Sequence, residues 1–143
     1  MTTRYRLAND ATDYTLCREL LAAEGFTEVA DIAFPTVMAV DDDGEVIGAM
    51  ATTPHDDMVL AGPLVLRHDK RRPFTAKQLI QLYETTMRGL GIKSFIFQTI
   101  GDNMIWQAVN RYFPDLKPYA IEGENRFYVW PLRAEEPLNG QST

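Results

Sequence analysis

The chain has 143 residues and a formal net charge of -6, with 45% hydrophobic and 24% charged residues. This length suits one domain with its own core, and the composition is that of a globular rather than a disordered protein. The acidic balance argues against a general nucleic-acid-binding protein, which carries a basic surplus. The single cysteine, Cys17, excludes an intramolecular disulfide and a cysteine-based metal site, and we expect no bound metal.

The first ten residues lack the apolar segment of a signal peptide, and no apolar run reaches the ~20 residues that span a bilayer. We therefore expect a cytoplasmic protein that does not act at a membrane. Apolar periodicity ends after Leu132, so residues 1–132 are predicted to form a single domain and residues 133–143 a flexible tail.

The first part of the chain predicts a short strand, Arg4–Leu7, and then a helix. Asp10 is a suitable N-cap for this helix and Gly25 a suitable stop. Its apolar face consists of Leu16, Cys17, Leu20 and Leu21. Residues 26–35 are mixed and fit either a second short helix or a loop.

Three strands are expected next, at Thr36–Val40, Glu45–Thr53 and Met58–Leu66. Asp41-Asp42-Asp43-Gly44 is a strong hairpin turn between the first two. Gly62-Pro63 interrupts the third strand. Because proline cannot donate to a strand ladder, this point predicts a bulge, an edge or a splay.

The clearest helix is predicted at Ala76–Leu90, with a Thr75/Gln78 capping box and a hydrophobic staple between Phe74 and Leu79. The remaining elements are a strand at Lys93–Ile100, a helix that opens at Asp102-Asn103 and ends at Pro114, and strands at Lys117–Glu122 and Asn125–Leu132. The resulting order is βα(α)βββαβαββ, and the strand–helix–strand unit around Ala76–Leu90 predicts a parallel crossover.

This order of elements resembles the GCN5-related N-acetyltransferases (GNATs) over Arg4–Leu132. The resemblance implies a mixed α/β (α+β) fold, in which a mostly antiparallel sheet is flanked by helices and contains one splayed parallel pair, here Met58–Leu66 and Lys93–Ile100. Gly62-Pro63 falls where the family carries a bulge. Acetyl-CoA or CoA is the implied cofactor, with its pantetheine arm in the splay and the backbone N–H groups of Leu64, Val65 and Leu66 holding the acyl carbonyl.

The family binds the cofactor phosphates with an Arg/Gln-x-x-Gly-x-Gly/Ala loop, which corresponds here to the residues after Leu66. Arg67 matches the first position, whereas Lys70 and Arg72 replace the glycines that allow close backbone approach. Positive side chains gather instead, at Arg67, Lys70, Arg71, Arg72 and Lys77. We expect these side chains to clamp a pyrophosphate next to Thr75 and Ala76 at the helix start; the alternative is a solvated basic turn.

The resemblance also implies catalytic candidates. Asn103 matches a family asparagine that contacts CoA, although it also suits ordinary helix capping. Tyr112 is the candidate acid that protonates the leaving thiolate, with a core tyrosine as the alternative and Tyr119 as a weaker candidate. His55 has the intrinsic pKa of a general base, although it sits in a sequence typical of a plain turn. Glu28 and Asp31 could help bind a cationic amine, and Cys17 is expected in the core.

Three functions fit these observations. The first is an acetyl-CoA-dependent N-acetyltransferase, in which a primary amine attacks directly in a ternary complex; the amine is a small molecule, a peptide N-terminus or a protein lysine. The second is a catalytically degenerate GNAT-like interaction module, favoured by the missing glycines, in which the basic loop and a face carrying Trp106 contact a protein. The third is an unrelated small-molecule-binding α/β domain. A homodimer is compatible with each.

Overall fold

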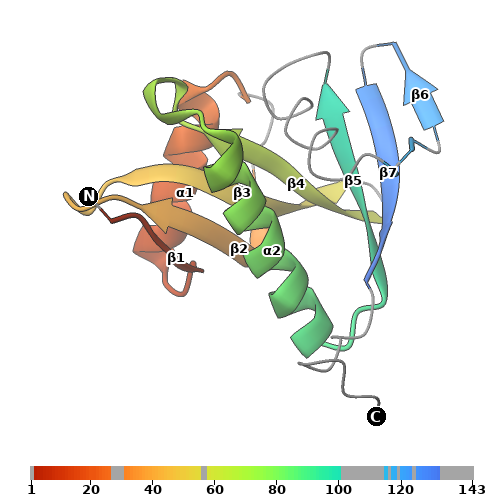
Figure 1. Cartoon of the computed structure of the whole chain (residues 1–143), viewed down its shortest axis with the longest axis horizontal. Helices are drawn as coiled ribbons and strands as arrows, with labels where there is room; N and C mark the ends of the chain where they lie inside the picture. The colour runs from red at the N-terminus through yellow and green to blue at the C-terminus, as the bar shows by residue number, and fades with distance from the viewer. Residues whose placement is uncertain are drawn as a thin grey trace.

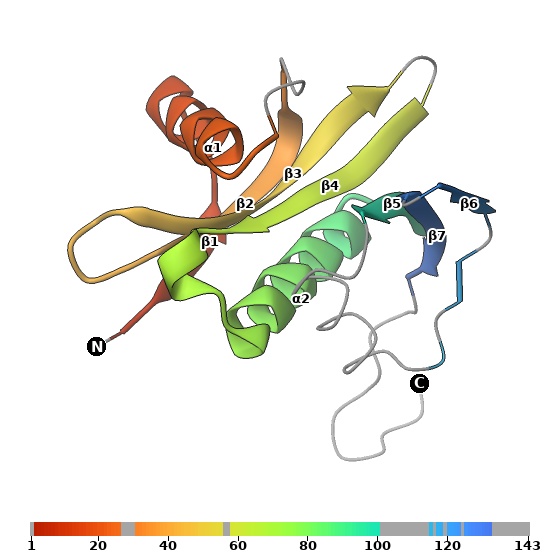
Figure 2. The ribbon, with the colours of Figure 1, turned by 90° about the horizontal axis from the view of Figure 1, so that it is seen from above.

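The computed structural model describes residues 2–26, 31–55, 58–100, 115, 117–118, 120–123 and 125–132 (Figure 1). The elements are β1 Arg4–Leu7, α1 Ala11–Ala23, β2 Ala33–Val40, β3 Val46–His55, β4 Met58–Leu66, a turn of 3-10 helix at His68–Lys70, α2 Pro73–Gly89, β5 Ser94–Ile100, β6 Ala120–Glu122 and β7 Asn125–Pro131. These strands form one sheet in the order β1-β2-β3-β4-β5-β7-β6. Helices α1 and α2 cover opposite faces of it (Figure 2).

Helix α1 follows the sequence prediction at both ends. The Asp10 side chain accepts a hydrogen bond from the Asp13 backbone N–H at 2.8 Å, and Gly25 follows the helix with a φ of 99°. Cys17, Leu20 and Leu21 are buried against the sheet as predicted. Leu16 was wrongly placed on this face: it is 39% exposed, because it lies at the margin of the buried stripe.

Helix α2 begins at Pro73, three residues before the predicted start. The predicted capping box is wrong, because Arg72 occupies the N-cap position without a side-chain hydrogen bond and Thr75 is buried within the first turn. The predicted staple is wrong as well, since Phe74 is 61% exposed. The physical reason is Pro73, whose fixed φ suits the first helical position and whose missing N–H needs no partner there.

The sheet has the mixed architecture that the sequence predicted. Strands β1 to β4 form an antiparallel meander, β4 and β5 run parallel, and β5, β7 and β6 are antiparallel. β2 begins at Ala33, three residues earlier than predicted, and β3 continues to His55. The described part of the last hairpin is shorter than predicted at its first strand, which spans Ala120–Glu122.

Each face of the sheet has its own hydrophobic core. Under α1 the core includes Cys17, Leu21 and Met38, all less than 2% exposed. Under α2 the fully buried Leu79 and Tyr83 pack on aromatic residues of β5 and β7. The rings of Tyr83 and Phe95 meet edge to face at a centroid distance of 5.3 Å, and Phe97 stacks on Tyr128 at 4.7 Å. The contact of Tyr83 with Phe95 joins α2 to the antiparallel β5–β7 pair.

No helix within the described ranges is long and apolar enough to cross a membrane.

Candidate functional site

The parallel pair β4 and β5 separates after a short contact. Its register contains Leu60 opposite Ile96 and Ala61 opposite Phe97. Beyond Ala61, β4 continues through Leu64, Val65 and Leu66, which pair with β3 but not with β5. Figure 1 shows the two strands diverging toward their C-terminal ends. The predicted splayed pair is therefore confirmed.

A bulge marks the point of divergence. Met50 pairs with Leu64 and Thr52 with Ala61, so Gly62 and Pro63 together face a single residue of β3. Gly62 has a φ of 128°, a conformation that residues with a side chain rarely adopt. Its carbonyl oxygen accepts a hydrogen bond from the Thr53 hydroxyl, which fixes the bulge to β3. The bulge predicted at Gly62-Pro63 is confirmed.

Backbone donors of β4 face the opening. The Arg67 N–H donates to the Ile47 carbonyl oxygen of β3 at 2.8 Å. Because successive N–H groups of an extended chain point to opposite edges, those of Leu66 and Leu64 point away from β3, toward the edge of β4 that β5 no longer pairs with. The N–H of Val65 points toward β3, so its predicted role as a donor to the acyl carbonyl is wrong. An acyl or amide carbonyl placed beside this edge would find two donors already in position.

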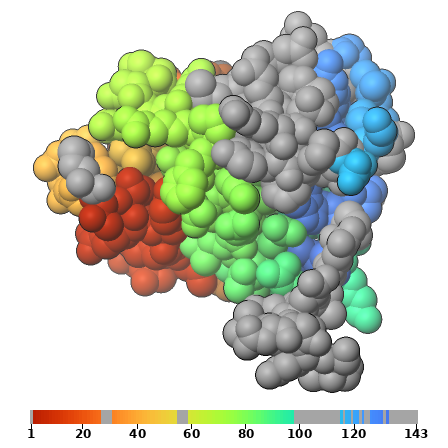
Figure 3. Space-filling view, viewed as in Figure 1, coloured from red at the N-terminus to blue at the C-terminus, as the bar shows by residue number. Residues whose placement is uncertain are grey.

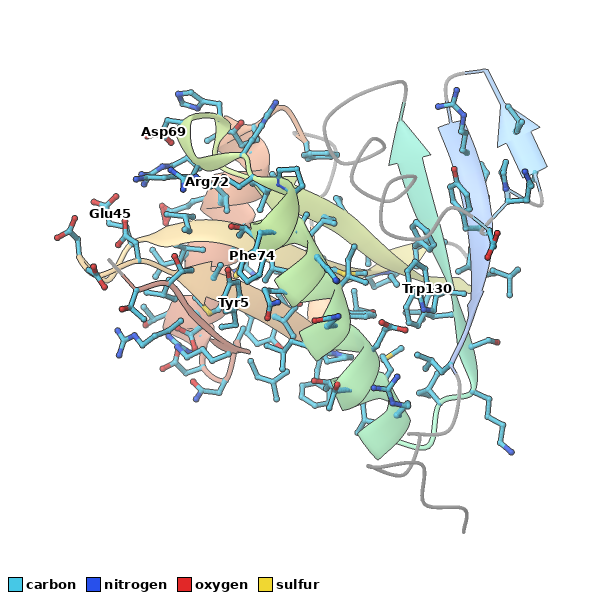
Figure 4. The ribbon with its side chains drawn as sticks, viewed as in Figure 1. Tyr5, Glu45, Asp69, Arg72, Phe74 and Trp130 are labelled. Atoms are coloured by element: carbon cyan, nitrogen blue, oxygen red, sulfur yellow. The ribbon has the colours of Figure 1, made fainter. Side chains whose placement is uncertain are left out.

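The segment 67–72, which we call the basic loop, joins β4 to α2. Arg67 anchors its first residue: Nη1 lies 2.8 Å from Glu45 Oε2, and Nε lies 2.7 Å from Asp69 Oδ1. The hydrogen bond from Arg67 lowers the pKa of Asp69. The Arg67 side chain is only 24% exposed, and its guanidinium binds both carboxylates. Arg67 therefore attaches the loop to the β2–β3 turn. Figure 4 shows Glu45, Asp69 and Arg72 at this end of the molecule, beside the start of α2.

A second anchor comes from Glu24, the C-cap residue of α1. Its Oε2 lies 3.0 Å from His68 Nδ1, and its Oε1 lies 2.8 Å from Arg71 Nη2. Hydrogen bonds from the His68 ring, the His68 backbone N–H and Arg71 lower the pKa of Glu24, so the carboxylate is charged at neutral pH. Arg71 Nε also donates to the Leu66 carbonyl oxygen at 3.3 Å.

Two cationic side chains of the basic loop make no ion pair with a carboxylate of the described residues. They are Lys70 and Arg72, the two residues that replace the expected glycines. Both adjoin the N-terminus of α2, where the first hydrogen bond is that of the Ala76 N–H to the Arg72 carbonyl oxygen at 3.2 Å. The N–H groups of Phe74 and Thr75 therefore have no acceptor within the helix. Charge and backbone donors together suit an anion here.

Of the other candidate site residues, some lie within the described part of the chain and some outside it. Tyr112, Asn103, Trp106, Tyr119 and Glu28 lie outside the described residues. Thr75 and Ala76 are 6% and 1% exposed, so only their backbone can reach a ligand without rearrangement. Asp31 precedes β2 and is exposed. Lys77 lies in the first turns of α2 and interacts with another group of the chain.

His55 is the last residue of β3, and its backbone pairs with Met58. Met58 precedes Gly62 by four residues, which is ~13 Å along an extended strand. His55 thus lies near the start of β4, at the end opposite to the one where β4 and β5 diverge. Cys17 is fully buried, as predicted, and burial raises the pKa of its thiol to about 11, so it is an inert core residue.

Sequence reasoning missed the acidic partners of the basic loop, Glu24, Glu45 and Asp69. One signal was available for Glu24: it ends a helix whose last turn contains no basic residue. A carboxylate at the negative end of a helix dipole is unfavourable unless a cation from elsewhere compensates it. No group of His, Cys, Asp or Glu in the described part of the chain could hold a metal ion.

The same architecture occurs in proteins of known structure, although no sequence comparison finds a relative. No family model and no curated protein sequence matches the chain. Solved structures do match. A GNAT-family N-acetyltransferase (YhbS) of Escherichia coli in complex with CoA is 20% identical, with a TM-score of 0.66 over 92% of this chain and 82% of that one.

The names of two further matches state two different kinds of amine substrate. An aminoglycoside 6'-acetyltransferase type Ii is 16% identical, with a TM-score of 0.65 over 94% of this chain and 99% of that one. The ribosomal-protein-S18-alanine N-acetyltransferase of Escherichia coli is 12% identical, with a TM-score of 0.64 over 96% and 99%. The chain therefore has the GNAT fold.

Proposed function

We propose that this chain with the GNAT fold is an acetyl-CoA-dependent N-acetyltransferase that moves an acetyl group to a primary amine by direct attack in a ternary complex. The observation that carries the proposal is the opening between β4 and β5, with its bulge at Gly62-Pro63 and the N–H groups of Leu64 and Leu66 directed into it. A fold alone does not define an activity, whereas an opening with aligned donors is a feature of a site.

The described residues fit such a cofactor at two places. The β4 backbone would hold the pantetheine arm and the thioester carbonyl in the opening. Lys70, Arg72 and the N-terminus of α2 would hold the phosphates, with side-chain charge replacing the close backbone approach that glycines allow. Arg67 and Arg71, which are bound to carboxylates, would shape the loop rather than contact phosphate directly.

The bound thioester supplies an activated acyl group. Donors on β4 would stabilise the negative charge that develops on the carbonyl oxygen as the amine attacks. The opening would orient the amine against the carbonyl carbon. We retain Tyr112 as the proposed acid for the leaving thiolate and Asn103 as a proposed cofactor contact. His55 pairs with Met58, ~13 Å along β4 from the bulge, so it is too distant to take the amine proton directly and is not retained as the base.

Ligand-dependent thermal unfolding tests the cofactor site. Acetyl-CoA or CoA at ~100 times its dissociation constant should add ~2.7 kcal/mol to the free energy of unfolding, with a clear rise in Tm. ATP, which has phosphates but no pantetheine arm, should give a smaller shift. No shift with CoA at millimolar concentration would refute the proposal and leave the interaction module as the leading function.

A double variant tests the phosphate contact. Lys70→Ala with Arg72→Ala should raise the dissociation constant of CoA at least ~10-fold, which corresponds to ~1.4 kcal/mol. The matched control is Arg88→Ala with Lys93→Ala, which also removes one arginine and one lysine. Arg88 lies in the last turn of α2, ~23 Å from its start, and Lys93 follows the helix just before β5. Equal loss in both variants would point to a general charge effect instead of a clamp.

A further inference from the structure

Glu24 occupies an electrostatically unfavourable position. It is the C-cap residue of α1, where the backbone carbonyls leave a partial negative charge, and the last turn of the helix has no basic residue. Its side chain is nevertheless only 5% exposed, so water does little to solvate the charge. A partly shielded carboxylate at the negative end of a helix is stabilised by cations from another part of the chain.

Both cations come from the basic loop. His68 Nδ1 lies 3.0 Å and Arg71 Nη2 lies 2.8 Å from the two oxygens of the same carboxylate. These contacts join residues 44 and 47 positions apart in the sequence. They also join the two faces of the sheet, because α1 lies on one face and the basic loop leads to α2 on the other (Figure 2).

The contacts of Glu24 determine which loop cations remain for a ligand. With Arg67 held by Glu45 and Asp69, and Arg71 by Glu24, only Lys70 and Arg72 of the loop's lysines and arginines have no carboxylate partner among the described residues. Arg71 also donates to the Leu66 carbonyl at the end of β4, so it folds back on the strand. Glu24 thus fixes one side of the loop while the other side stays available. Figure 3 shows the loop and the start of α2 at the molecular surface.

We propose that Glu24 is a positioning residue of the cofactor site, which holds His68 and Arg71 so that Lys70, Arg72 and the first turn of α2 face the phosphates. This inference rests on the proposed function. It assigns to a carboxylate at the end of α1 the task of fixing a loop in which Lys70 and Arg72 stand where glycines would allow close backbone approach. Glu24 itself would not contact the cofactor.

The test compares two ligands on Glu24→Gln. The amide keeps the size of the side chain but loses the charge and one of the two acceptors, so the loop should loosen. The dissociation constant of CoA should rise about fivefold, the lower end of the coupling found between linked sites. The dissociation constant of S-acetylpantetheine should not change, because this fragment ends before the pyrophosphate. Glu19→Gln, the same change at an exposed residue of α1, should alter neither constant.

Each outcome has a distinct meaning. Wild-type protein that does not bind CoA refutes the proposed function itself. Wild-type binding with an unchanged constant in Glu24→Gln overturns the positioning role alone, and so does tighter binding, which would mean that the carboxylate competes with phosphate for Arg71. Equal loss for CoA and S-acetylpantetheine would indicate a general distortion of the site and would also overturn the positioning role. Should Glu24→Gln not fold, Glu24→Asp, which keeps the charge but shortens its reach, is expected to show the same selectivity between the ligands with a smaller loss.

Discussion

Gly48 of β3 shows how closely single residues are packed between the sheet and α2. A Cβ atom at this position would lie 2.8 Å from Leu66 Cδ2, 3.1 Å from Leu79 Cδ1 and 3.3 Å from the Val65 carbonyl oxygen. The two leucine methyl groups are ends of side chains that can rotate, but both are buried, and the carbonyl is fixed in the β3–β4 ladder. No single movement relieves all three contacts.

We therefore expect Gly48→Ala to lower the free energy of unfolding by ~1–3 kcal/mol, the usual cost of an overfilled core. Gly89→Ala is the matched control. It lies in the last turn of α2 with no atom within 4 Å of the added Cβ, and should be neutral or stabilise by up to ~1 kcal/mol through helix propensity. Urea unfolding of both variants measures the difference. Equal stability would show that β3 and α2 are less tightly packed than described.

At the scale of elements, Asp10 illustrates a helix end fixed by one side chain. Its carboxylate accepts the Asp13 N–H at 2.8 Å, while Asp13 in turn binds Arg6 Nη1 at 2.7 Å and the Asn9 N–H at 3.0 Å. Asp10→Ala should cost ~1 kcal/mol of stability, because one N–H of the first turn loses its acceptor. Asn9→Ala should leave stability nearly unchanged, since its backbone N–H is retained. A comparable loss in both variants, measured by thermal unfolding, would contradict this account.

The elements that the sequence predicted well are those with local signals. The bounds of β4 are those predicted, Gly62-Pro63 forms the bulge, and Asp10 caps α1. The start of α2 was wrong because two local signals competed: the Thr75/Gln78 pair fits a capping box, but Pro73 already satisfies the geometry of a first helical residue.

The partners of the basic loop could not be predicted in the same way. Arg67 meets Glu45 and Arg71 meets Glu24 only because the meander and α1 bring distant residues to one end of the sheet. The sequence shows that cations are concentrated there, but which of them remain available depends on tertiary contacts. Tyr112 and Asn103 lie outside the described residues, so their roles stay predictions that rest on the family resemblance.

At the scale of the whole molecule, the two cores each contain a titratable group kept neutral by burial. Under α1, burial raises the pKa of Cys17 from 9.0 to about 11; under α2, burial raises the pKa of Tyr83 from 10.0 to about 12, although its hydrogen bond with Thr52 opposes the rise. In the unfolded chain both groups ionise at their ordinary pKa. Between the two pKa values of each group the folded state therefore binds more protons than the unfolded state.

Below pH 9 both groups are neutral in the folded and the unfolded chain, so their contribution to the free energy of unfolding is fully present. This contribution should be lost as the pH rises through about 11 for Cys17 and about 12 for Tyr83. The thiol alone accounts for roughly 2–3 kcal/mol of the fall. Cys17→Ala removes that group. The variant should start less stable at neutral pH by ~1–2 kcal/mol, because buried volume is lost, but should lose less stability between pH 9 and about 11. Urea unfolding across this range measures both slopes. Parallel slopes for the variant and the wild type would mean that the core under α1 admits a charged thiolate without unfolding, contrary to its complete burial.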